Sequence, residues 1–257
     1  MDYIFICLVA FIGAALTLFS GFGLGTMLLP VFGLFFPIEI AIVLTSIVHF
    51  LNNIFKLSLF GKKANVSVIL RFGILALLFS FLGAYTLKSL LNIQPLFQYS
   101  IEGKTFEVTV IKLVIGFLLL FFALIDFLPK YKNIEFEQKY LPIGGILSGF
   151  FGGISGHQGA LRSAFLIRTN LSKEAFVATG VVIACLVDVS RLSVYLPQII
   201  SNKVNIDYKL IVLATLSAFS GVYLGNKILQ KTTIKTIQNT VAFLLVIYSI
   251  LLIIGVL

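Results

Sequence analysis

Charged residues are scarce in this chain. Only 11% of its 257 residues are Asp, Glu, Lys or Arg, whereas 59% are hydrophobic, and the mean hydropathy is +1.09. Soluble domains carry about a quarter charged residues, so a water-soluble globular protein is excluded. The composition indicates an integral membrane protein whose surroundings are the lipid bilayer.

Acidic residues are the scarcer of the two charged classes. Ten Asp and Glu stand against nineteen Lys and Arg, which gives a net charge of +9. The basic residues occur in ones and twos between apolar runs and do not cluster on one face, so a nucleic-acid partner is excluded. Basic residues at the ends of apolar runs are typical of side chains that orient helices in a bilayer.

Motifs for redox, metal or ATP chemistry are also missing. The two cysteines, Cys7 and Cys185, occur in separate apolar runs without a CxxC partner. The sequence therefore predicts no disulfide framework, no metal site and no cofactor. No GxxxxGK[ST] motif supports ATP hydrolysis. The segment that begins at Met1 lacks the basic residues of a cleaved signal peptide, so we expect it to be transmembrane sequence.

The apolar runs predict an all-α integral membrane fold. An α-helix needs about 20 apolar residues to span a ~30 Å hydrocarbon core. Six runs are of this kind: 39–60, 66–90, 107–128, 173–199, 206–229 and 233–256.

Two further stretches are rich in glycine and predict broken helices. No charged residue occurs from Tyr3 through Ile38, and a single helix of that length would extend about 54 Å, too far for one crossing. Three glycines at alternate positions from Gly21 to Gly25 mark the break, because glycine lowers helix propensity and permits positive φ. Residues 140–168 repeat the pattern with seven glycines. Close helix packing through small residues is the alternative explanation.

A shift of 135 residues aligns the two halves of the chain. It places Asn53 on Asp188 and Lys56 on Arg191. We therefore predict two homologous repeats within a single membrane domain, each a broken helical hairpin followed by three transmembrane helices. The segments are a first membrane repeat at 1–128, a charged cytoplasmic linker at 129–139 and a second membrane repeat at 140–257.

The positive-inside rule predicts the topology. Sixteen Lys and Arg lie outside the mid-span positions. If the broken elements cross the membrane, eight of these residues fall on each side of it. If each broken element enters and leaves on the same side, eleven fall on the cytoplasmic side and five on the outer side. The eleven are Lys62, Lys63, Arg71, Lys130, Lys132, Lys139, Arg168, Lys173, Lys227, Lys231 and Lys235, and the five are Lys88, Lys104, Lys112, Lys203 and Lys209. The asymmetry favours re-entrant hairpins, inverted repeats and both termini outside the cytoplasmic membrane, an arrangement typical of transporters.

The helix that follows each break begins near the membrane midplane. A helix N-terminus carries unpaired N–H groups and partial positive charge, which favour an anion. We therefore expect a small anion to bind between the two tips. The candidate binding residues there are Gly23, Gly25, Thr26, Gly156, His157, Gln158, Gly159 and Arg162.

Three of these tip residues have alternative explanations. Arg162 follows an uncharged stretch, and a midplane arginine without a partner costs at least ~2.5 kcal/mol, so we expect function there rather than snorkelling or a carbonyl contact. His157 could donate to an oxyanion, carry a coupled proton or cap the helix. Thr26 could donate its hydroxyl to the anion or act as an N-cap.

Polar residues also share faces of the helices that follow the hairpins. Asn52, Asn53 and Lys56 fall at helical spacings in one half, as do Asp188 and Arg191 in the other. We expect Asn52, Asn53 and Arg191 to contact the substrate, and Asp188, like His157, to be a candidate proton-coupling group. A scaffolding ion pair between Asp188 and Arg191 is an equal alternative.

The remaining charged and polar groups in these helices have structural explanations. Lys56 lies about one turn from the end of its span and could snorkel to the surface. His49 fits a buried core histidine, and Glu39 and Glu174 complement helix dipoles at first turns.

The segment Gly21-Phe-Gly-Leu-Gly-Thr-Met-Leu-Leu-Pro30 and its degenerate repeat Gly152-Gly-Ile-Ser-Gly-His-Gln-Gly159 resemble the sulfite exporter TauE/SafE family. With the duplication and the number of spans, the resemblance covers essentially the whole chain. The sequence departs from the common pattern at Leu24 and Thr26, and at His157-Gln158 with Arg162. The resemblance implies a cytoplasmic-membrane permease that exports a small anion, such as sulfite or another oxidised-sulfur or organosulfonate anion.

We therefore expect a secondary transporter that works by alternating access, and not an enzyme. The alternative is a membrane-embedded enzyme acting on a sulfur compound, with His157 and Ser155 or Ser163 as the conceivable catalytic pair, although HExxH and GxSxG motifs are absent. The sequence leaves open the anion, the direction of transport, the coupling ion and whether the protein forms a homo-oligomer.

Overall fold

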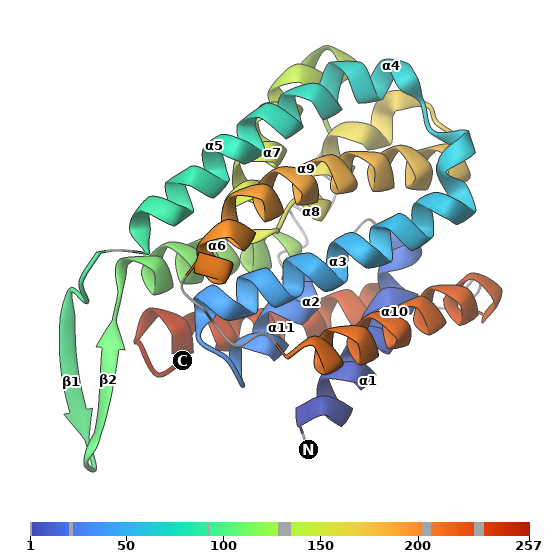
Figure 1. Cartoon of the computed structure of the whole chain (residues 1–257). Helices are drawn as coiled ribbons and strands as arrows, with labels where there is room; N and C mark the ends of the chain where they lie inside the picture. Colours follow the sequence, from blue (N-terminus) through green and yellow to red (C-terminus); the bar gives the residue numbers. More distant parts are fainter. Residues whose placement is uncertain (1, 21–22, 92, 128–134, 202–206, 229–233) are drawn as a thin grey trace.

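The computed structural model describes residues 2–20, 23–91, 93–127, 135–201, 207–228 and 234–257 (Figure 1). The longer helices are α1 (Asp2–Ser20), α2 (Leu24–Gly33), α3 (Ile38–Phe60), α5 (Ile74–Leu90), α6 (Val110–Phe127), α7 (Leu141–Ser155), α8 (Gly159–Leu166), α9 (Lys173–Ser201), α10 (Tyr208–Ile228) and α11 (Ile234–Ile253). The short helical pieces are η1 (Gly61–Lys63), α4 (Val66–Val68), η2 (Ile69–Gly73), η3 (Gln138–Tyr140) and η4 (Ile167–Thr169).

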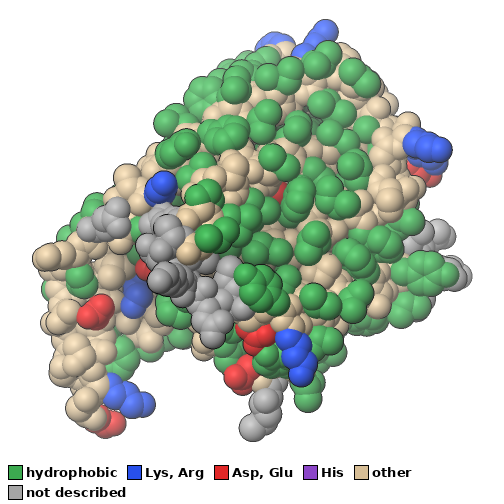
Figure 2. All heavy atoms as spheres, viewed as in Figure 1, with side chains coloured by type: hydrophobic (Ala, Val, Ile, Leu, Met, Phe, Trp, Pro, Cys, Tyr) green, Lys and Arg blue, Asp and Glu red, His purple; other side chains and the backbone are tan. Residues whose placement is uncertain are grey.

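Each of the six predicted spans is helical over most of its described residues. Four described segments are long and apolar enough to cross a membrane: Ile38–Lys63, Val66–Leu90, Lys173–Pro197 and Tyr208–Gly225. Helices α6 and α11 contribute shorter apolar stretches, Val110–Ile125 and Val241–Ile253. Figure 2 shows hydrophobic side chains spread over one face of the molecule, with most of the charged side chains towards its edges. The prediction of an all-α membrane protein is confirmed.

Both glycine-rich stretches contain breaks in the helix. Helix α1 ends at Ser20 and α2 begins at Leu24; α7 ends at Ser155 and α8 begins at Gly159. In each pair the second helix runs back towards the start of the first.

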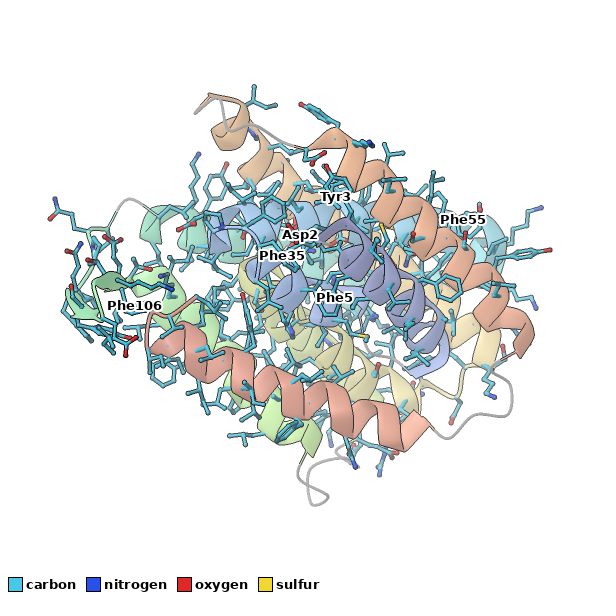
Figure 3. All side chains as sticks on the ribbon, turned by 90° about the horizontal axis from the view of Figure 1, so that it is seen from below. Asp2, Tyr3, Phe5, Phe35, Phe55 and Phe106 are labelled. Atoms are coloured by element: carbon cyan, nitrogen blue, oxygen red, sulfur yellow. The ribbon has the colours of Figure 1, made fainter. Side chains whose placement is uncertain are left out.

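Contacts at the open ends of these two hairpins show the return. The rings of Phe5 at the start of α1 and Phe35 just after α2 meet edge to face, with centroids 6.3 Å apart (Figure 3). The ring of Phe165 near the end of α8 covers Gly144 near the start of α7. In each broken pair, the second helix therefore ends close to where the first helix began.

Glycines bring the hairpin helices against long helices of the other half of the chain. Along α7, the Cβ positions of Gly145, Gly149 and Gly153 lie on backbone atoms of η2 and α5, and α1 approaches α10 in the same way at Gly221 and Gly225. Close packing through small residues therefore explains most of the glycines in α7, whereas the break itself lies at residues 156–158. In the second glycine-rich stretch, some glycines therefore allow close helix packing and others form the helix break.

Helices α3 and α9 pack against each other, and α6 packs against α11. The two termini lie at one end of the molecule together with the β-hairpin (Figure 1). At this terminal end, Nζ of Lys112 donates to the carbonyl oxygens of Glu107 and Gly255, at 3.0 and 3.4 Å. The opposite end includes exposed Lys62 and Lys63 of η1.

A β-hairpin at the terminal end is absent from our sequence-based expectations. Strand β1 (Phe97–Ile101) pairs antiparallel with β2 (Lys104–Val108), with Phe97 opposite Val108. Glu102 and Gly103 have φ of 50° and 79°, the positive values of a type I′ turn. Because residues 104–108 form this strand, α6 begins at Val110 and not at the predicted position 107.

The predicted linker at 129–139 is described only from residue 135 onward. Its described part lies against the end of α8: the Phe136 ring stacks on Phe165 with centroids 4.2 Å apart, and Nε of Arg168 donates to Oε2 of Glu135 at 2.9 Å. The division into two repeats and a linker stays a prediction.

Candidate functional site

The tips of the two broken helices meet in the interior. The Cβ position of Gly25 lies 3.8 Å from the carbonyl oxygen of Gly156. Gly156 has φ of 78°, and its Cβ position falls on the guanidinium of Arg191, so both backbone conformation and space require glycine. Gly159 is buried as the first residue of α8.

The first tip is built without a side-chain cap. Gly23 is the N-cap of α2 in an extended conformation, and its Cβ position lies 3.5 Å from Nε2 of His49. Thr26 is the third residue of α2, and its backbone N–H donates to the carbonyl of Gly23 at 3.1 Å. The N-cap alternative for Thr26 is therefore wrong.

The second tip carries two buried polar side chains. His157 stacks on Phe122 with an interplanar angle of 10°, and its Nδ1 lies 3.3 Å from the carbonyl oxygen of Ser155. Among the described residues, neither Nε2 of His157 nor the amide of Gln158 has a hydrogen-bond partner. No side chain caps α8, so the capping alternative for His157 is wrong.

The geometry does not join His157 and Ser155 as a catalytic pair. The hydroxyl of Ser155 donates to the carbonyl of Phe151 at 3.1 Å and accepts the backbone N–H of His157 at 3.3 Å. The imidazole faces the Ser155 carbonyl and not its hydroxyl.

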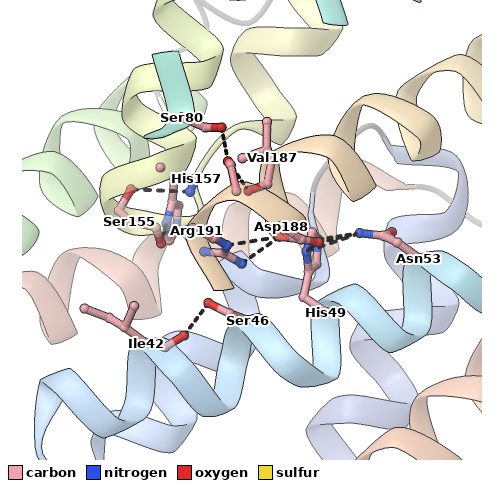
Figure 4. A network of polar contacts seen from close by, with 12 residues as sticks. Ile42, Ser46, His49, Asn53, Ser80, Ser155, His157, Val187, Asp188 and Arg191 are labelled. Carbon is pink, nitrogen blue, oxygen red and sulfur yellow. Dashed lines mark hydrogen bonds and ion pairs between the residues drawn. The ribbon is translucent and has the colours of Figure 1, made fainter. Parts of the chain in front are cut away.

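A buried polar network joins α3 to α9 (Figure 4). Nδ1 of His49 lies 2.6 Å from Oδ2 of Asp188, which also accepts a hydrogen bond from the amide of Asn53 at 3.2 Å. Oδ1 of Asp188 accepts from Nε of Arg191 at 3.0 Å, and Nη2 of Arg191 lies 2.9 Å from the same oxygen. The exposed fractions of these four residues are all 4% or less. Asp188 is thus shared by three partners.

Sequence reasoning did not place His49 in the site. Its neighbour in the network, Asp188, is 139 residues away, so no local spacing links them. His49 is buried, as the sequence predicted, but its ring also contacts the carboxylate of Asp188. The ion pair expected between Asp188 and Arg191 is present.

A small cavity lies beside this network, on the side towards the start of α9. It measures about 40 Å³, room for roughly three water molecules, which is comparable to a small oxyanion. Its lining residues come from α1, α3, α8, α9 and the first tip: Thr17, Gly23, Leu24, His49, Asn53, Lys56, Arg162, Ser163, Leu166, Phe176, Val177, Gly180 and Val181.

Two cations face this cavity. Lys56 is buried, and neither a hydrogen bond nor an ion pair joins it to the described part of the chain. Arg162 is the fourth residue of α8, and its Nε lies 3.2 Å from the Cβ position of Gly180 on α9. Nη1 of Arg162 is buried without a hydrogen-bond partner among the described residues. Lys56 does not snorkel to the surface, and that alternative is wrong.

The predicted residues therefore fall into four groups. Gly23, Asn53 and Arg162 line the cavity, whereas Arg191 belongs to the network with Asp188. The other tip residues, Gly25, Thr26, Gly156, His157, Gln158 and Gly159, are buried around the meeting point of the breaks. Asn52 is fully buried apart from the cavity, and both of its amide atoms lack partners in the described structure.

Comparison with known proteins agrees with this architecture. No curated protein matches the chain. A family model described as Sulfite exporter TauE/SafE matches residues 6–252, which include both broken helices, the α3–α9 network and the cavity. The chain therefore belongs to the sulfite exporter TauE/SafE family of membrane permeases.

Proposed function

We propose that this protein is a secondary transporter that exports a small oxidised-sulfur anion, with sulfite or a small sulfonate as substrate. The observation that carries the proposal is the cavity with Lys56 and Arg162 in its wall and no carboxylate beside them in the lining. Buried cations without partners are costly, and an anion with several oxygen acceptors satisfies them. Family membership supports the class of substrate.

We propose that the halves are inverted repeats that move against each other. Asn53 and Asp188, equivalent under the 135-residue shift, are in direct contact, as expected for positions close to a pseudo-two-fold axis. The partners also correspond: hairpin helix α1 packs on α10 of the other half, and α7 packs on α5. Alternating access would then separate the hairpin tips on one side of the anion and close them on the other.

The proposed direction agrees with the electrical driving force. We propose that the terminal end faces outward, because the sequence-based topology assigns eleven basic residues to the cytoplasmic side against five outside, and Lys62 and Lys63 of the eleven lie at the opposite end. With an inside-negative potential, an exported anion gains about 2.3 kcal/mol per charge per 100 mV. Export needs no coupled ion on that ground.

Asp188 and His157 stay the candidates for proton coupling. Asp188 is held by His49, Asn53 and Arg191, and His157 has one ring nitrogen free of partners among the described residues. If either group carries a proton in the cycle, the rate changes strongly between about pH 5 and pH 8. A flat rate across that range in proteoliposomes would remove this role.

Purified protein in liposomes tests the transport proposal directly. We expect labelled sulfite to cross the membrane chemically unchanged and Arg162→Gln to reduce the initial rate at least about tenfold, because the neutral amide cannot replace the guanidinium charge. Arg168→Gln is the matched control, since Arg168 is exposed and pairs with Glu135 away from the cavity. Conversion of sulfite without its movement would favour the enzyme alternative, and equal rates for both variants would place the site elsewhere.

A further inference from the structure

The charges buried between the two hairpins do not balance. Lys56 and Arg191 are buried, Arg162 is half-buried with its Nη1 in the interior, and Asp188 is the carboxylate buried among these three cations in the described core. Asp188 contacts one of the cations, Arg191, through both Nε and Nη2. Two positive charges are therefore left without a counter-charge in the interior.

The equivalent cations of the two halves have different neighbours on their own helices. Lys56 and Arg191 correspond under the 135-residue shift, and the residue three positions earlier is Asn53 in one half and Asp188 in the other. Arg191 is neutralised on its own helix, whereas Lys56 has a neutral amide in that place. The substitution of an amide for a carboxylate leaves the charge of Lys56 available to a ligand.

Lys56 and Arg162 converge on the same cavity. They come from α3 and α8, and they repel each other because both are cations in the wall of the same small cavity. Hydrogen-bonding capacity is also unused: Nη1 of Arg162 and the hydroxyl of Thr17, which is 6% exposed, have no partners among the described residues. A ligand that satisfies this wall needs several oxygen acceptors and enough charge for two cations.

We propose that the cavity selects its substrate as a dianion, with Lys56 and Arg162 each neutralising one negative charge and Thr17 contacting an oxygen. A small oxyanion with two charges is preferred over a monoanion of the same size, which leaves one buried cation uncompensated. This inference rests on the proposed anion transport and adds the charge state of the substrate. It also makes Lys56 a residue that determines specificity.

Binding and transport together test the proposal. The probes are thiosulfate, a small dianion, and methanesulfonate, a monoanion of similar size. We expect the purified wild-type protein to bind thiosulfate at least tenfold more tightly than methanesulfonate. Lys56→Met removes one cation, so the preference falls to about threefold or less, mainly through weaker thiosulfate binding, and Lys56→Arg restores it. Lys62→Met, which removes an exposed lysine of η1, keeps the wild-type ratio.

The possible results distinguish a failure of the dianion proposal from a failure of the proposed transport function. Equal binding of the two probes by wild-type protein, or an unchanged ratio in Lys56→Met, overturns the dianion proposal. Tight thiosulfate binding without movement of any sulfur anion across liposomes overturns the transport function and leaves the dianion site standing. If Lys56→Met does not yield a folded monodisperse protein, Arg162→Lys, which keeps the charge, and Arg162→Gln, which removes it, provide the same comparison at the second cation.

Discussion

Asp188 is the residue on which the buried polar network depends. It accepts a hydrogen bond from Asn53, contacts His49 and Arg191, and is fully buried between α3 and α9. A buried ion pair contributes little net stability when it is complete, but removal of one partner strands the other charge.

This asymmetry predicts the effect of Asp188→Asn. We expect the variant to lose about 3 kcal/mol of unfolding free energy, because Arg191 keeps its charge without a carboxylate. Unfolding of the purified protein in mixed micelles with increasing SDS measures the change. The double variant Asp188→Leu/Arg191→Met should lose clearly less than the single variant. A double variant as unstable as the sum of the two single variants would show that the pair is not coupled.

At the scale of elements, glycine sets the distance between α7 and α5. Gly149 has its Cβ position on backbone atoms of Ala76, so any larger side chain separates the two helices. A few positions away on the same helix, Leu147 is exposed on the surface.

We therefore expect Gly149→Val to destabilise the protein by about 3 kcal/mol, at the upper part of the range for overpacked cores, because the clash is with backbone. Leu147→Val serves as the control and should change the free energy of unfolding by less than about 0.5 kcal/mol. The shift of the thermal unfolding midpoint in detergent compares the two. Equal shifts would mean that α7 and α5 do not approach as closely as the structure shows.

Among the described residues, one polar contact joins the start of α1 to the start of α10, and its acceptor is the titratable carboxylate of Asp207. The hydroxyl of Tyr3 donates to Oδ2 of Asp207, and the backbone N–H of Leu210 donates to Oδ1 at 3.0 Å. These bonds, the one from Tyr3 foremost, hold the pKa of Asp207 below its ordinary value. The carboxylate therefore favours the docked helix at neutral pH, and this contribution is lost as the pH falls through the lowered pKa.

Hydrogen exchange at the first turns of α1 should report this change. We expect protection to persist at neutral pH and to fall when the pH drops below about 4, the ordinary range for aspartate. Exchange must be compared after correction for the intrinsic effect of pH. Asp207→Asn should remove the acid-dependent step. A step that persists in this variant would assign it to another group.

At the scale of the whole molecule, the two ends differ in charge and in projecting structure. The terminal end carries both termini and the β-hairpin, and the opposite end carries Lys62 and Lys63 (Figure 1). The proposed orientation places the opposite end in the cytoplasm.

Single cysteines in a background without Cys7 and Cys185 test this orientation. A cysteine at Lys104, which is exposed on β2, should react with a membrane-impermeant maleimide in intact cells. A cysteine at Lys63, exposed in η1, should react only after permeabilisation. The reverse labelling pattern would invert the proposed topology.

Much of the helical framework follows from local sequence. Apolar runs long enough for a bilayer give the six spans within a few residues, and the stretch after Tyr3 is too long for one crossing, so it must break. The β-hairpin escaped prediction because Glu102-Gly103 is a weak turn signal next to a long apolar run. The role of most α7 glycines was also ambiguous, since glycine both breaks helices and allows them to pack closely.

The sequence by itself determined that this chain is a membrane protein of broken and spanning helices, because hydrocarbon requires apolar length and internally paired backbone. It also singled out Arg162, Asp188 and Arg191, since charges stand out in apolar runs. Only the tertiary structure decided which of these charges are compensated. The i, i+3 spacing on α9 pairs Asp188 with Arg191, the packing of α3 against α9 adds His49, and the return of α8 sets Arg162 beside Lys56. The contact of His49 with Asp188 and the approach of Arg162 to Lys56 each join residues more than a hundred positions apart, which no local pattern encodes.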